Sequence, residues 1–135
     1  MENNDIRWKQ RFQNFKRALK HLKDALQIKN SDIIQKAGII QFFEMSYELG
    51  WNTVKDFLED QGFIDVKSPR TALKKAFEIG LISDRHICMN LSIDRNLTAN
   101  TYDEAKVTEV ERLIHHKYFP MLKQLYDTFK LKENE

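Results

Sequence analysis

The sequence predicts an all-α protein, an antiparallel up-and-down bundle of about five helices. Three observations favour this class. Apolar residues recur at helical spacing, no segment shows the alternation that is typical of strands, and the 135 residues include only four Gly and two Pro. The length suits one compact domain, so we expect residues 1–135 to form a single helical-bundle domain.

The first predicted helix is long and amphipathic. It spans about residues 5–28, and its apolar face is formed by residues three or four positions apart, namely Phe12, Phe15, Leu19, Leu22 and Leu26. The second helix is expected to begin after Ser31, which is a good N-cap residue, and to end near Gln61. Gly62 then supplies the C-terminal stop.

One carboxylate interrupts the apolar stripe of the second helix. All the other members of this stripe are apolar or amphipathic: Ile33, Ala37, Ile40, Tyr47, Trp51, Val54 and Leu58. Glu44 lies among them, and a buried carboxylate is costly unless it is paired or protonated. We expect Arg95 to be its partner. The alternative is that the stripe drifts around the helix and places Glu44 at the rim.

Turn residues define the third helix. Ser68 is suited to cap it, and Pro69 loses no needed hydrogen bond at the first helical position. The helix should run to Ile79 and stop at Gly80.

Two further helices complete the predicted bundle. The fourth is expected to start at Ser83-Asp84. The fifth begins with a capping box that has Thr101 at the N-cap and Glu104 three positions later. Pro120 should kink or split the fifth helix.

Composition and charge exclude several classes of protein. No apolar run approaches the roughly 20 residues of a membrane span, and the first residues do not resemble a signal peptide. With Cys88 as the single cysteine, no intrachain disulfide can form, and a cytoplasmic location is expected. No metal is expected, because His115 and His116 are about 100° apart on a helix and do not face one ion. No cofactor is expected either, because the sequence contains no Gly-rich phosphate loop.

Positive charge is concentrated in the first helix. Residues 1–29 hold eight Lys/Arg against three carboxylates, although the net charge of the whole chain is only +2. Such a helix can lie along phosphates. The alternative is a solvated face opposite the apolar stripe.

The richest polar cluster lies at the junction of the fourth and fifth helices, where Arg95, Asn96, Asn100 and Tyr102 fall within eight residues. Arginine suits phosphate, and the N-terminus of the fifth helix adds free N–H groups nearby. The junction is therefore predicted to bind an anion, with Glu44 facing it. The alternative is a structural knot, in which Arg95 pairs with Glu44 or Asp94 and Asn100 caps a backbone group.

Four segments in the same order resemble the nucleotidyltransferase substrate-binding protein family, a branch of the HEPN superfamily that includes HepT-type toxins. They cover nearly the whole chain, and they are residues 7–15, 43–51, 68–70 and 94–104. The resemblance implies a helical bundle, usually a homodimer, that is paired with a minimal nucleotidyltransferase. It implies nucleotide or RNA as a further ligand, and no membrane.

The toxin branch adds expectations for single residues. There, an arginine and a histidine cleave RNA without metal, and a tyrosine is adenylylated by the partner. By position Arg95 matches the arginine, Tyr102 matches the tyrosine, and Asn100 stands in place of the histidine. An amide does not exchange protons near neutral pH, so Asn100 cannot act as a general base.

These expectations lead to three candidate functions. The first is a non-catalytic substrate-binding partner of a nucleotidyltransferase, with Tyr102 as a site of adenylylation. The second is a metal-independent endoribonuclease toxin of a toxin–antitoxin pair, with Arg95 and Asn100 at the ribonuclease-motif positions, which would make the chain an enzyme. The third is a helical adaptor without a small ligand. Asn100 favours the first over the second.

Overall fold

The computed structural model describes residues 2–83 and 103–135, with side chains from Asp5 onward. The described residues are helical and contain no strand. The helices are α1 (Glu2–Leu26), α2 (Ile33–Asp60), α3 (Pro69–Glu78), α5 (Glu104–Leu113) and α6 (Phe119–Glu133), with the π-helical segment η2 (Ile114–Tyr118) between the last two. The all-α prediction is confirmed, whereas the fourth predicted helix lies outside the described residues.

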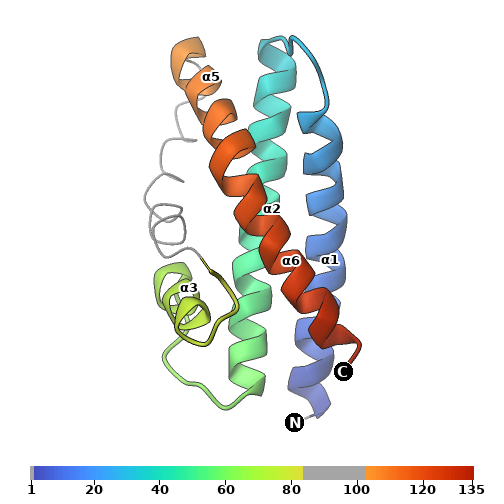
Figure 1. Ribbon diagram of the computed structural model, residues 1–135, viewed down its shortest axis with the longest axis vertical. Coiled ribbons are helices and arrows are strands. Elements are labelled where there is room, and N and C mark those ends of the chain that lie inside the picture. The colour runs from blue at the N-terminus through green and yellow to red at the C-terminus, as the bar shows by residue number, and fades with distance from the viewer. Residues whose placement is uncertain (1, 84–102) are drawn as a thin grey trace.

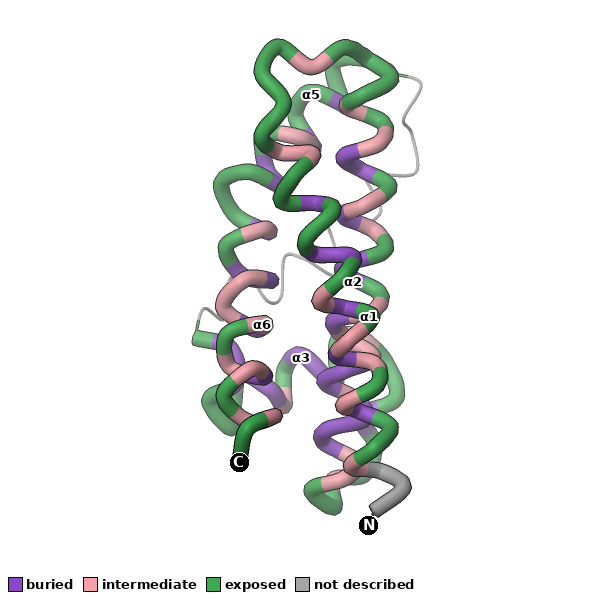
Figure 2. Tube along the Cα trace, turned by 90° about the vertical axis from the view of Figure 1, so that its right-hand side faces the viewer, coloured by how far each residue is buried: buried purple, intermediate pink, exposed green. Residues whose placement is uncertain are grey.

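Helix α2 is the centre of the fold. It contacts α1, α3, α5 and α6. Helices α1 and α2 run antiparallel, and the continuous α5–η2–α6 rod crosses them obliquely (Figure 1), which brings the two termini to the same end of the molecule. Buried positions face inward along all of these helices (Figure 2).

An aromatic cluster joins three of the helices. The ring of Trp8 on α1 lies 5.3 Å from that of Phe57 on α2 and 5.5 Å from that of Phe129 on α6. The Phe57 and Phe129 rings are 5.4 Å apart in an edge-to-face arrangement, which is the geometry that aromatic pairs prefer. The cluster therefore holds α6 against the α1–α2 pair at the end of the bundle where the two termini lie (Figure 1).

Local signals place several helix ends correctly. Ser68 caps α3 and Pro69 is its first residue, as predicted. Gly62 and Gly80 follow α2 and α3 with φ of +94° and +86°, backbone conformations that glycine adopts without strain. The stop signals at these two glycines are confirmed.

Two predicted caps are wrong by one or two residues. Asp32, not Ser31, caps α2, and it forms a capping box with Gln35. Asp103, not Thr101, caps α5, and its side chain accepts hydrogen bonds from the N–H groups of Ala105 and Lys106. In both cases the predicted residue and the observed one are good N-cap types one or two positions apart, so residue type alone does not choose between them.

The apolar stripe of α2 begins later than predicted. Ile40, Tyr47, Val54 and Leu58 are buried, but Ile33 and Ala37 are exposed. The first turn of α2 lies at the end of the helix pair, where less of the neighbouring structure covers it (Figure 1).

The interruption before Pro120 is a π-helical turn. The N–H of Phe119 bonds to the carbonyl of Ile114, five residues back, and α6 begins at Phe119. Proline has no N–H to continue the α-helical pattern, and a widened turn is a common way to accommodate it. The sequence predicts that Pro120 kinks or splits this helix; the structure shows a π-helical interruption within a continuous helical rod.

Gly50 on α2 leaves room for the ring of Phe15 on α1. A Cβ added at Gly50 would lie 3.1 Å from Cε1 of Phe15, whereas one added at Gly38, also in α2, would meet nothing within 4 Å. We expect Gly38→Ala to raise the free energy of unfolding by about 1 kcal/mol through helix propensity. Gly50→Ala should give a smaller gain or a loss, because Phe15 must move. Urea denaturation of both variants measures this difference, and equal gains would contradict the close approach.

A half-buried ion pair fastens α5 to the start of α2. Oε1 of Glu111 lies 2.9 Å from Nζ of Lys36, and its Oε2 accepts a 2.7 Å hydrogen bond from Ser31. Burial raises the pKa of Glu111, but the hydrogen bonds from Ser31 and Lys36 and the charge of Lys36 outweigh it, so this pKa is lowered. The interaction therefore stabilises the fold above the ordinary pKa of 4.5 and is lost as the pH falls through the lowered value.

The pH dependence gives a test of this pair. We expect Glu111→Gln to reduce the free energy of unfolding by about 1 kcal/mol near neutral pH. The difference from the parent should shrink on acidification, because the parent then also carries an uncharged side chain. Thermal denaturation across pH measures it, and a difference that does not change with pH would contradict the charge-based account.

Candidate functional site

Of the cluster predicted at the junction of the fourth and fifth helices, the structure describes only Glu44. Arg95, Asn96, Asn100 and Tyr102 lie outside the described residues. Their clustering, and the pairing of Arg95 with Glu44, stay predictions.

Glu44 is the one member of this predicted cluster that the structure describes. It is half-buried on α2 and lines a shallow hollow of about 410 Å³ together with Gln41, Met45, Glu48 and Leu49. All five residues come from α2, so this hollow is a surface of one helix. Glu44 is thus neither in the apolar core nor fully exposed.

A larger groove lies between α1 and α6 and has a volume of about 450 Å³. Its α1 side carries Lys16, Lys20 and Lys23, which are four and three residues apart and therefore share one face of the helix. Its α6 side carries Phe119, Lys123 and Tyr126 at the same spacing. Gln13, Arg17 and Leu19 complete the lining.

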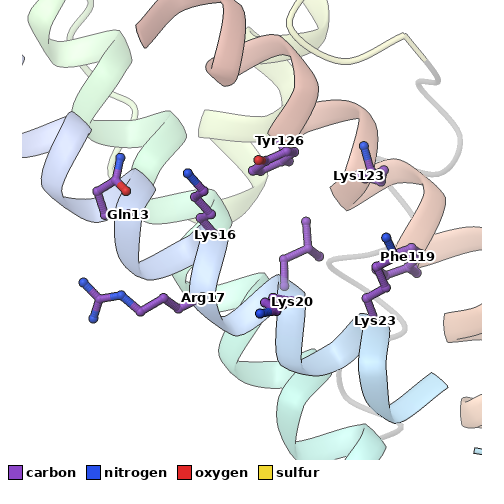
Figure 3. A pocket seen from close by; sticks show the side chains of 9 residues that line it. Gln13, Lys16, Arg17, Lys20, Lys23, Phe119, Lys123 and Tyr126 are labelled. Atoms are coloured by element: carbon purple, nitrogen blue, oxygen red, sulfur yellow. The ribbon is translucent and has the colours of Figure 1, made fainter. Parts of the chain in front are cut away.

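The two sides differ in chemistry. Lys16 and Lys23 extend from α1 toward α6, while Arg17 extends away from it (Figure 3). Tyr126 extends from α6 toward α1 (Figure 3) and rests on the buried ring of Phe12, 5.6 Å between centroids. The groove thus has an apolar, aromatic wall and a cationic wall.

The groove is strongly positive. Among the described residues that line it, five are Lys or Arg and none is a carboxylate. Nζ of Lys123 is 2.6 Å from Oδ1 of Asp127, which partly neutralises it. Lys16, Lys20 and Lys23 form no ion pair with any residue in the described ranges 5–83 and 103–135.

One side of this groove is evident from the sequence. The excess of Lys and Arg in residues 1–29 indicates a basic helix, and binding to phosphates is one of its two interpretations. The contribution of α6 is not evident, because nothing local shows that Phe119 and Tyr126 face α1. Their spacing of seven residues, with Lys123 between them, is the only signal in the sequence.

The described residues show neither a metal centre nor a membrane span. No group of three or more His, Cys, Asp or Glu in residues 5–83 and 103–135 could hold a metal ion. His115 and His116 are both exposed. Within the same ranges, no helix is both long and apolar enough to cross a bilayer.

Comparison with solved structures finds a similar fold. A crystal structure of a protein from Thermus thermophilus superposes with a TM-score of 0.74 at 26% sequence identity, covering 82% of this chain and 94% of that chain. No curated protein matches the sequence.

Comparison with protein families gives an assignment. Residues 10–131 match the family described as "Nucleotidyltransferase substrate binding protein like". The match includes about two thirds of α1, all of α2 and most of α6, so it covers the groove-lining part of α1 and α6 and the helix that carries Glu44. The chain therefore belongs to the nucleotidyltransferase substrate-binding protein family.

Proposed function

We propose that this chain is the non-catalytic, substrate-binding partner of a nucleotidyltransferase, with which it forms a hetero-oligomer. The family match over residues 10–131 carries this proposal. The helical fold of the described residues is compatible with this proposal.

The finer proposal places the chain in the HEPN superfamily as a homodimer. Its anion-binding cluster comprises Arg95, Asn96, Asn100 and Tyr102, with Glu44 facing it. Tyr102 is the proposed site of adenylylation by the partner. What supports the cluster is the residue chemistry together with the half-buried position of Glu44 on α2.

Co-expression with a minimal nucleotidyltransferase from the same genome tests the function. We expect the two chains to copurify in a fixed ratio, and the mass of this chain to rise by one adenylyl group when the partner is supplied with ATP. Tyr102→Phe should abolish the added mass while the complex still forms. If the two chains do not associate at micromolar concentration, the proposal is wrong.

A further inference from the structure

We propose that the groove between α1 and α6 binds a nucleoside polyphosphate, with its phosphates on the lysines of α1 and its base on the aromatic wall of α6. The proposal rests on the proposed function, since it names the class of substrate that the subunit would hold. The described residues that line the groove all come from α1 and α6.

The row of lysines gives the first argument. With a rise of about 1.5 Å per residue, Lys16, Lys20 and Lys23 follow one another along α1 at steps of about 6 and 4.5 Å. Neighbouring phosphates of a polyphosphate chain can each contact one such cation. Like charges three or four residues apart destabilise a helix, and none of these lysines forms an ion pair with a described carboxylate. A bound polyanion would reduce this repulsion.

The aromatic wall gives the second argument. Tyr126 is half-buried. Its ring centroid lies 5.6 Å from that of Phe12 and 5.3 Å from Nζ of Lys123. Phe119 lies two turns earlier and is also half-buried. A flat base can stack on such a ring, since every nucleobase has a π-face. A ligand made only of phosphate would leave this wall exposed to water.

The volume of the groove and the length of its row of lysines limit the size of the ligand. A volume of about 450 Å³ lies within the range of small-molecule sites, about 300–1,000 Å³. Its cations on α1 occupy only two turns, from Lys16 to Lys23. The groove is thus matched to one nucleotide with its phosphates, and a longer nucleic acid would extend beyond the charged row.

Calorimetric titration of the full chain with ATP tests the proposal. We expect one molecule of ATP per chain, and binding that weakens by about tenfold or more in the double variant Lys16→Gln/Lys20→Gln. The matched control is Lys106→Gln/Lys117→Gln, which removes the same charge at two exposed positions outside the groove and should bind ATP within about twofold of the parent. Equal losses in both double variants, or no binding by the parent at millimolar ATP, would overturn the proposal.

Inorganic tripolyphosphate separates stacking from charge. We expect Tyr126→Leu to weaken ATP binding by about tenfold while leaving tripolyphosphate binding unchanged, because the lysines remain. Tyr126→Phe keeps the ring and should bind both ligands like the parent. If Tyr126→Leu binds ATP as the parent does, the base does not use this wall and the proposal fails.

Two results would show that the groove binds something other than a nucleoside polyphosphate. A ten-nucleotide single-stranded RNA that binds more than about tenfold tighter than ATP, and loses affinity in Lys16→Gln/Lys20→Gln, would identify a nucleic-acid surface. Loss of copurification with the nucleotidyltransferase in the same double variant would identify a docking surface for the partner. Either result would overturn the proposal.

If the parent forms the complex but does not bind ATP in the groove, the inference fails and the proposed function stands. If ATP binds as described but no complex forms, the proposed function fails.

Discussion

Phe12→Ala is expected to lower the free energy of unfolding by about 4 kcal/mol. Phe12 is fully buried on α1, and its ring lies 5.9 Å from that of Phe129 and 5.6 Å from that of Tyr126, both on α6. Truncation removes this contact between the first and last helices and leaves a cavity that the flanking rings cannot fill. The free energy of unfolding of a domain of this kind is about 5–15 kcal/mol in total, so the loss is a large fraction of its stability.

Two variants calibrate the measurement. Phe12→Leu keeps most of the apolar volume and should cost about 1.5 kcal/mol. Leu131→Ala, at a residue that is 72% exposed, should change stability by less than about 0.5 kcal/mol. Guanidinium denaturation of all three variants provides the comparison. If Phe12→Ala unfolds at the same midpoint as Leu131→Ala, the described packing of α6 on α1 is contradicted.

We expect the parent chain alone not to cleave RNA efficiently, and Asn100→His to gain activity by about 10²–10⁴-fold. Cleavage through a ribose 2′-hydroxyl needs one group that removes a proton and another that returns one to the leaving oxygen. An imidazole does either near neutral pH, whereas the amide of Asn100 does neither.

Fluorescence from a quenched RNA substrate measures the activity. Arg95→Ala placed on top of Asn100→His should remove the gained activity, because the phosphate then loses its cationic contact. If the parent chain cleaves RNA and Arg95→Ala abolishes this cleavage, the chain is a ribonuclease and the proposed role as a non-catalytic partner subunit is wrong.

The groove and the helix 4–5 junction differ in how far the sequence alone reveals them. The lysines of α1 can be recognised from their spacing, but the aromatic wall that faces them comes from residues more than 90 positions later. The junction residues Arg95 and Tyr102 are close in sequence, and their residue types and the motif resemblance are what identify them. Local spacing therefore reveals sites within one segment and misses those built from two helices.

Several features follow from the sequence by itself. The helical class follows from the apolar spacing of residues such as Phe12, Phe15 and Leu22, which are buried as predicted. The ends of α2 and α3 follow from Gly62 and Gly80, because their effect on the backbone is local. The π-helical interruption of the last rod follows from Pro120, whose missing N–H has the same consequence in any helix.

Only the tertiary structure decides the rest. Whether Asp32 or Ser31 caps α2 depends on how the chain leaves α1, and whether Glu44 is buried depends on what packs on α2. That Phe119 and Tyr126 face Lys16 and Lys23 depends on the oblique crossing of α6 over α1. Spacing along one helix determines which residues share a face, but side-chain packing between helices determines what that face meets.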